Sequence, residues 1–126
     1  MNQPNMLSDI EWKIMKAVWD KGEAPVKEIW QIAFPEQEKA YTTIQTYMDR
    51  MVDKGLLKKR KLGLVNFYTA QMEESTLTKK ATDNLAKRVF DGKVGRLAAF
   101  LMKSYDISDK ELEEIKKLIN EKEKEQ

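Results

Sequence analysis

Apolar residues recur at intervals of three and four in three stretches of the N-terminal half of the chain, residues 9–20, 25–33 and 41–54. This spacing is typical of amphipathic helices that bury one face against other elements. Ser8 begins a capping-box pattern ahead of the first stretch. The pattern therefore predicts three helices, the second of which has Pro25 in its first turn.

Two β-compatible segments follow Gly55, which is a suitable residue to end the third helix because glycine tolerates a positive φ. These segments, residues 56–61 and 65–70, are joined around Gly63 and predict a β-hairpin with a short tip. Three helices followed by a hairpin indicate a winged helix-turn-helix domain, which we assign to residues 1–72.

The large aromatic residues of this region are interpreted as structural. Trp12, Trp19 and Trp30 fall on the apolar faces of the predicted helices, which is typical of core residues. Alternation along the second hairpin segment predicts that one of Phe67 and Tyr68 packs inward while the other covers the sheet. Stacking of the hairpin aromatics on single-stranded bases is the alternative.

The apolar pattern of the C-terminal part is purely helical and predicts three further helices, over residues 73–91, 94–103 and 108–120. The last helix is expected to fray into the charged tail, residues 121–126. Because the apolar stripes are too narrow to be buried in a free monomer, we expect a second copy of the chain to cover them. The alternative is that this segment folds back on its own N-terminal domain. We therefore assign residues 73–126 as a helical dimerisation domain of a mainly α protein with a small β-hairpin.

Composition narrows the chemistry that the chain can perform. Of its 126 residues, 35% are charged and 41% hydrophobic, as in a folded, helix-rich protein, and neither cysteine nor histidine is present. Disulfides, thiolate catalysis, Cys-ligated zinc and histidine-based catalysis are therefore excluded, and we expect neither an enzyme nor a bound metal or cofactor. The sequence has no stretch of membrane-spanning length and no signal-peptide pattern, so we expect a cytoplasmic protein.

Charge is distributed unevenly along the chain, although the net charge is only +2. Residues 1–38 have a net charge of −3, residues 39–72 a net charge of +5 and residues 73–126 a net charge of zero. Residues 54–72 contain no acidic residue. The positive charge therefore belongs to the predicted third helix and hairpin.

The solvent face of the predicted third helix carries Thr42, Thr43, Gln45, Thr46 and Arg50. Threonine is a mediocre helix former, so local stability does not explain three threonines in five positions. Short hydroxyl side chains let a helix approach the major groove closely, where threonine can contact base edges, phosphates or the thymine methyl and glutamine can pair with adenine. The alternative is that these residues only solvate or cap an exposed helix.

The first hairpin segment carries a basic run that includes Lys59, Arg60 and Lys61. Such a run can be a solvated strand edge, where lysine discourages aggregation. Because this run lies in a hairpin next to a predicted recognition helix, we expect it to contact phosphates instead. The helix face and the basic run together predict a DNA-binding protein.

A family resemblance extends through nearly the whole chain. The segments that carry it are Ser8–Trp12, Val18–Trp19, Tyr41–Thr46, Arg50–Met51, Lys54–Leu57 and Phe67–Tyr68. With these residues the sequence resembles the bacterial penicillinase repressor family, whose relatives include methicillin-resistance and copper-operon repressors. The resemblance implies a homodimer that binds a palindromic operator and represses a resistance-type operon such as that of β-lactamase, with the third helix in the major groove and the hairpin on the backbone.

The resemblance also assigns roles to individual residues. It makes Thr43 and Thr46 candidates for base contacts and Arg50 and Arg60 candidates for phosphate contacts. Gln45 stands where penicillinase-type members have a basic residue, so the operator sequence does not carry over from the family.

In penicillinase-type members, a membrane sensor protease cleaves the dimerisation region and so releases the operator. The resemblance places the corresponding bond between Phe100 and Leu101, although the local residues depart from the family's Asn-Phe pair. Copper-operon relatives sense metal through C-terminal cysteines. This chain has no cysteine, so that route is excluded.

Two other functions are compatible with the sequence. Winged helices also mediate protein assembly, and the basic hairpin could bind an acidic protein. The other alternative, non-specific architectural DNA binding, is less consistent with a helix face of threonine and glutamine, because a pure backbone binder needs cations there. An enzyme would have only carboxylates as acid–base groups. A preference among DNA duplexes of different sequence distinguishes these functions from operator binding.

Overall fold

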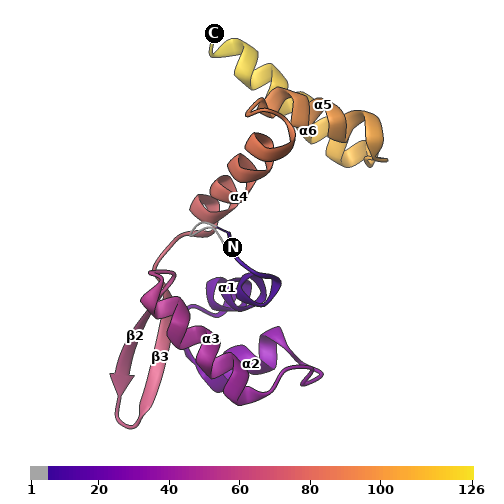
Figure 1. Ribbon diagram of the computed structural model, residues 1–126. Coiled ribbons are helices and arrows are strands. Elements are labelled where there is room, and N and C mark those ends of the chain that lie inside the picture. The colour runs from indigo at the N-terminus through magenta and orange to yellow at the C-terminus, as the bar shows by residue number, and fades with distance from the viewer. Residues whose placement is uncertain (1–5) are drawn as a thin grey trace. The chain divides into compact units, whose positions relative to one another are not determined.

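A computed structural model describes residues 6–126 of the chain, which divides into two compact units, Met1–Asn84 and Leu85–Gln126. The described residues are mainly helical and include one small sheet (Figure 1). The elements in chain order are α1 (Asp9–Lys21), β1 (Ala24–Pro25), α2 (Val26–Ala33), α3 (Tyr41–Asp53), β2 (Leu57–Leu62), β3 (Val65–Ala70), α4 (Glu74–Val89), α5 (Val94–Ser104) and α6 (Asp109–Lys124).

Helix α1 begins with the capping box that the sequence predicts. The backbone N–H of Ser8 donates to Oε1 of Glu11 at 2.9 Å, and the backbone N–H of Glu11 donates to Oγ of Ser8 at 3.2 Å. Each bond satisfies an amide at the helix start that has no partner within the helix. Gly22 follows the last turn with a φ of 90°, a conformation that residues with a side chain rarely adopt. Both ends of α1 are thereby fixed by local sequence.

The sequence pattern does not predict strand β1, and it places the start of α2 one residue too early. Pro25 precedes the helix with a φ of −76° and a ψ of 165°, and it pairs with Phe67 of β3. Ala24 pairs with Tyr68. Proline is tolerated here because β1 lies at the edge of the sheet, whose strand order is β1-β3-β2.

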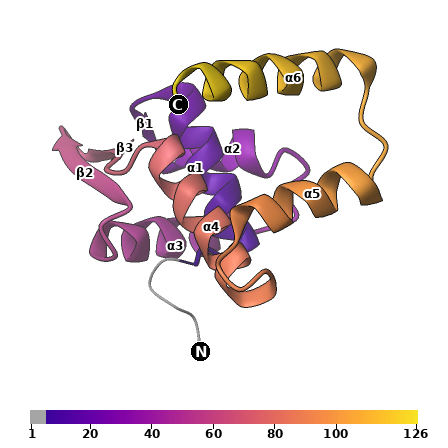
Figure 2. The same ribbon diagram turned by 90° about the horizontal axis from the view of Figure 1, so that it is seen from above.

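Strands β2 and β3 form the predicted hairpin, here called the wing (residues 57–70). It pairs in antiparallel register from Leu57 opposite Ala70 to Leu62 opposite Val65. The first loop residue, Gly63, has a φ of 65°, which is the conformation that a type II′ hairpin turn requires at that position. The wing projects from helices α1, α2 and α3 (Figures 1 and 2), and this arrangement confirms the predicted winged-helix fold.

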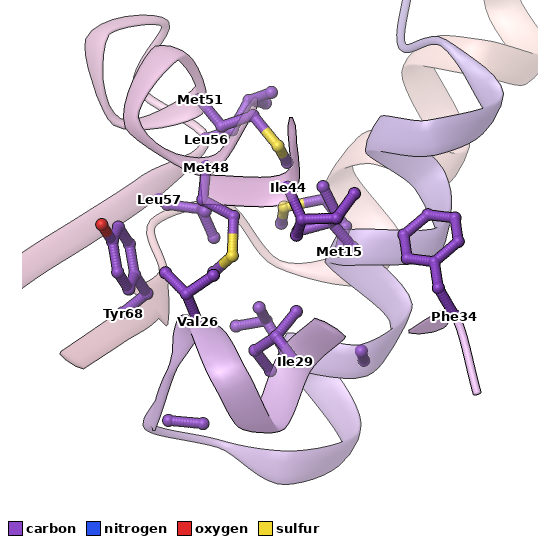
Figure 3. Packing of buried hydrophobic residues seen from close by; sticks show 14 of the residues in the cluster. Met15, Val26, Ile29, Phe34, Ile44, Met48, Met51, Leu56, Leu57 and Tyr68 are labelled. Carbon is purple, nitrogen blue, oxygen red and sulfur yellow. The ribbon is translucent and has the colours of Figure 1, made fainter. Parts of the chain in front are cut away.

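One hydrophobic core joins the three helices to the sheet (Figure 3). Met15 from α1, Ile29 from α2, and Ile44 and Met48 from α3 are fully buried in it. Tyr68 is buried at the wing side of the core, so the inward-facing aromatic of β3 is Tyr68. Burying each such side chain stabilises the fold by roughly 1.5–3 kcal/mol. The burial of Ile44 and Met48 therefore fixes α3 against the rest of the unit.

The tryptophans are partly buried against the same core, as the sequence predicts. The indole N–H of Trp19 donates to the backbone carbonyl of Met72 at 3.0 Å, and that of Trp30 donates to the carbonyl of Lys39 at 2.7 Å. The side chain of Trp12 lies 6.3 Å from that of Trp19, measured between ring centroids. These side chains therefore tie the loops around the helices to the core.

An ion pair between the buried Glu11 and the half-exposed Lys54 links the start of α1 to the end of α3. Glu11 is only 4% exposed, and its Oε2 lies 2.8 Å from Nζ of Lys54, the residue that ends α3. Burial alone would raise the pKa of Glu11, but the hydrogen bonds from Lys54 and Ser8 outweigh that effect and lower it. The carboxylate therefore remains ionised inside the fold.

Helices α5 and α6 of the C-terminal unit leave many of their apolar residues exposed. Helices α5 and α6 are separate helices joined by an extended linker (Figure 2), and neither helix contains a buried residue. The ring of Phe100 lies 5.7 Å from Phe90 and 6.3 Å from Tyr105. Helix α6 continues to Lys124, so the expected fraying from Glu121 onward is wrong. The reason is that the glutamates and lysines of this tail are good helix formers.

Candidate nucleic-acid interface

Helix α3 presents its polar residues to solvent. Ile44, Met48 and Met51 anchor its other face in the core, as the periodicity predicts. No acidic residue occurs in the first turn of the helix. The predicted site residues on α3, all of them exposed, are Thr42, Thr43, Gln45, Thr46 and Arg50.

The hydroxyl of Thr46 is already committed as a donor. Its Oγ1 donates to the backbone carbonyl of Thr42, one turn earlier in α3, at 3.0 Å. This bond orients the side chain, because a hydroxyl that donates backward along the helix leaves its lone pairs and its methyl group available outward. Thr46 can therefore accept a hydrogen bond or make an apolar contact, while Gln45 offers both a donor and an acceptor.

A polar contact couples the wing to α3. The phenol of Tyr68 donates to Oδ1 of Asp49 at 2.7 Å, and Nζ of Lys59 lies 3.3 Å from the same oxygen. Burial raises the pKa of Tyr68 and the Asp49 carboxylate raises it further, so the phenol remains a hydrogen-bond donor. Lys59 is thus held beside α3, with its side chain 38% exposed.

Arg60 projects from the opposite face of β2 and is held by Glu23. Its Nε and one terminal nitrogen each donate to a different Glu23 oxygen at 2.7 Å, which is a bidentate pair. The hydrogen bonds from Arg60 lower the pKa of Glu23, and the Glu23 carboxylate raises the pKa of Arg60. The charge of Arg60 is therefore partly balanced within the protein.

The remaining lysines of the wing are free of such partners. Lys58 and Lys61 are exposed, and neither forms an ion pair with any residue between 6 and 126. Sequence reasoning named Lys59 and Arg60 as cations but missed Glu23 and Asp49 as their partners. The signal in the sequence is weak, because only the fold brings these acids to the wing.

A shallow hollow lies between Gln45 of α3 and the tip of the wing. Its volume is about 410 Å³, and it lies beside the end of β1. Gln45 of α3 and Lys27 of α2 line one side of it, while Leu64, Val65 and Asn66 line the other. Gln45 of α3 and the tip of the wing therefore border one concave surface.

The predicted cleavage bond lies within a helix. Phe100 and Leu101 are in α5 and are 48% and 43% exposed.

Among the residues described, there is no group of three or more acidic side chains that could hold a metal ion, and no helix is long and apolar enough to cross a membrane.

Comparison with known proteins gives a consistent result. A family model described as penicillinase repressor matches residues 7–121. The methicillin resistance regulatory protein MecI of Mammaliicoccus sciuri is 26% identical over 96% of this chain and 98% of its own length. The penicillinase repressor of Bacillus licheniformis is 24% identical over 96% of this chain and 94% of its own length.

A solved structure supports the same relationship for the N-terminal unit. The solution structure of the DNA binding domain of the repressor BlaI is 31% identical and covers 60% of this chain and 92% of that domain, with a TM-score of 0.51. The family match spans both compact units, from α1 into α6. The chain therefore belongs to the penicillinase repressor family, whose members are winged-helix transcriptional regulators and not enzymes.

Proposed function

We propose that this chain represses transcription by binding a palindromic operator as a homodimer, with α3 in the major groove and the wing on the adjacent backbone. The observation that carries this proposal is the joining of two surfaces. The wing is held against α3, because the phenol of Tyr68 donates to Asp49 and Nζ of Lys59 lies 3.3 Å from the same carboxylate. The polar face of α3 beside this contact remains exposed. The likeness to the DNA binding domain of BlaI supports it.

The residues of this surface divide by chemistry. We assign base contacts to Thr43, Gln45 and Thr46, because their side chains are exposed and uncharged. Thr42 lies at the start of α3, where a hydroxyl reaches the backbone of the duplex. The basic residues are assigned to phosphates, which position the protein without reading sequence. They are Arg50, Lys59, Arg60 and Lys61.

We assign DNA binding to residues 1–72 and dimerisation to residues 73–126. The uncovered apolar residues of the C-terminal unit support the second assignment, because Val94, Leu118 and Ile119 are each more than half exposed. Leu77, near the start of α4, is buried in the core of the first unit. Helix α4 therefore provides a continuous connection between DNA binding and dimerisation.

Dimerisation can be tested by replacing Ile119 with aspartate. We expect Ile119→Asp to sediment as a monomer and to lose operator affinity, while Lys116→Asp, a charge change elsewhere on α6, remains dimeric. Sedimentation equilibrium of the full chain measures both. A monomeric wild type at micromolar concentration would contradict the dimer.

The similarity to MecI and to penicillinase repressors supports a resistance operon, such as that of a β-lactamase, as the regulated target. The protein would then act in the bacterial cytoplasm. The direct test is a titration, at fixed physiological salt, of an operator from upstream of its own gene against a scrambled duplex. We expect a preference of about a thousandfold with two chains per duplex. Equal, weak binding would favour architectural DNA binding or a protein-interaction role.

We further propose that a membrane sensor protease relieves repression by cutting between Phe100 and Leu101. The exposure of both side chains supports access. Because a protease binds an extended chain, α5 must open locally before the cut, and its lack of buried residues makes such opening inexpensive. Incubation with the cognate sensor should yield two fragments, one ending at Phe100 and the other beginning at Leu101. An intact chain after incubation with the activated sensor would contradict the proposal.

A further inference from the structure

The tip of the wing is apolar. Leu64 is 95% exposed, and its neighbours Leu62 and Val65 are 55% and 46% exposed. The turn itself does not require them, because Gly63 supplies the positive φ and the second loop position accepts many residues. Exposing aliphatic side chains at the end of a projecting hairpin favours aggregation unless they have a partner. The tip therefore has a role outside the folding of the hairpin.

The charge around the tip indicates the nature of that partner. Lys61, which pairs with Asn66 next to the tip, is exposed on β2 and forms no ion pair within residues 6–126, and residues 54–72 contain no acid. An apolar tip next to a free cation is complementary to the minor groove of DNA. That groove has phosphates along both edges, while its walls are apolar sugar faces.

The tip of the wing lies close to α3. Leu64 and Val65 border the same hollow as Gln45 of α3. If α3 occupies the major groove, the strand that separates the two grooves passes over this hollow. The wing tip, on the far side of that strand, then faces the adjacent minor groove.

We propose that Leu64 enters the minor groove beside each operator half-site and makes the protein favour A·T pairs there. This inference rests on the proposed operator binding. In the minor groove a G·C pair presents the N2 amino group of guanine, whereas A·T pairs present only acceptors. Burying that amino group against a leucine leaves a donor without a partner, so G·C pairs are disfavoured. The protein would thus read sequence outside the bases that α3 contacts.

The experiment uses the full chain and an operator in which adenines beside each half-site are replaced, one at a time, by 2,6-diaminopurine. This base adds an amino group to the minor groove and leaves the major-groove edge unchanged. We expect the wild type to lose about tenfold in affinity at the contacted positions. Leu64→Ala should bind the unmodified operator about three- to tenfold more weakly and should no longer respond to the modified base.

Two further variants separate apolar contact from other effects. Leu64→Lys should strengthen binding to all duplexes, steepen the salt dependence and lose the response to diaminopurine. Ile32 is another exposed aliphatic residue of the same unit, and its side chain lies near Lys13 and Lys16 of α1. Ile32→Ala should therefore behave like the wild type.

The outcomes distinguish this inference from the proposed function. The wild type's preference for operator over scrambled duplex, measured in the same titration, reports operator binding by itself. If that preference is present but diaminopurine has no effect at any flanking position, or Leu64→Ala responds like the wild type, the minor-groove role is wrong and operator binding stands. If the preference is absent, both are wrong.

Discussion

The phenol of Tyr68 donates a 2.7 Å hydrogen bond to the carboxylate of Asp49, and this bond joins the middle strand of the sheet to α3. The ring of Tyr68 is buried, whereas the side chain of Asp49 is 47% exposed. The wing and α3 are therefore coupled by a polar contact in addition to the hydrophobic core beneath it. Such a contact fixes the distance between the wing and α3, the two elements to which we assign DNA contacts.

Removal of the Tyr68 hydroxyl should destabilise the fold. We expect Tyr68→Phe to lower the free energy of unfolding by about 1 kcal/mol, because the ring keeps its packing and only the hydrogen bond is lost. Urea denaturation measures this change. Tyr105→Phe is the matched control, since Tyr105 is 61% exposed in the C-terminal unit. Equal stability of the two variants would show that the bond to Asp49 contributes nothing.

The buried Glu11 predicts a specific dependence of stability on pH. Its pKa in the folded protein lies below the ordinary value of 4.5, because the hydrogen bonds from Lys54 and Ser8 outweigh the effect of burial. A lowered folded pKa means that the stabilisation is fully present above the unfolded pKa and is lost as the pH falls through the folded pKa. We therefore expect the wild type to lose stability between about pH 5 and pH 3 more steeply than Glu11→Gln, which cannot titrate.

Urea denaturation at a series of pH values measures this difference. Near neutral pH, Glu11→Gln should be less stable than the wild type by about 1–3 kcal/mol, because Lys54 loses its charged partner. Glu28→Gln serves as the control, since the Glu28 side chain is 46% exposed and lies 3.9 Å from Lys21. Parallel pH profiles for wild type and Glu11→Gln would contradict the role of the buried carboxylate.

Local sequence signals predicted most of the helical framework. The capping box at Ser8 and the apolar spacing that ends in Met48 and Met51 correspond to real helices with the expected buried face. These signals work because each depends on residues three or four positions apart, where one sequence is sufficient. The hairpin was equally visible, since Gly63 marks its turn.

Contacts between distant residues could not be predicted in this way. Strand β1 has only two residues, Ala24 and Pro25, and exists because β3 is beside it. Arg60 and Glu23 are 37 positions apart, so their pairing depends on the fold. A basic run read from the sequence alone therefore overstates the charge that is free to meet phosphates.

The pairing of Arg60 predicts that Glu23 restrains DNA affinity. Glu23→Gln removes the negative charge that balances Arg60, while the amide oxygen can still accept a hydrogen bond. We expect the variant to bind cognate and scrambled duplexes more tightly by the same factor, with a salt dependence steeper by up to about one unit of slope. Arg60→Ala should weaken both duplexes alike and flatten the slope.

A matched neutralisation elsewhere tests whether the effect belongs to the wing. Asp83→Asn changes the charge of α4 by the same amount, at a carboxylate that lies 3.4 Å from Lys79. If Asp83→Asn strengthened binding as much as Glu23→Gln, the effect would arise from net charge alone. An unchanged salt dependence in Glu23→Gln would show that Arg60 makes no phosphate contact.

Thr46 offers the sharpest test of sequence reading, because its hydroxyl hydrogen is already bonded to the carbonyl of Thr42 at 3.0 Å. Outward, the side chain can offer only a methyl group and oxygen lone pairs. Thr46→Ala should therefore lower discrimination between cognate and scrambled operator, by about 1–3 kcal/mol if the contact is a full base readout. Thr46→Val keeps a methyl group in place and should retain most of the discrimination if that contact is with a thymine. Competition titrations of both variants measure this discrimination. If the Val variant discriminates as poorly as the Ala variant, the contact belongs to the Thr46 oxygen. If both variants discriminate like the wild type, Thr46 does not contact the bases.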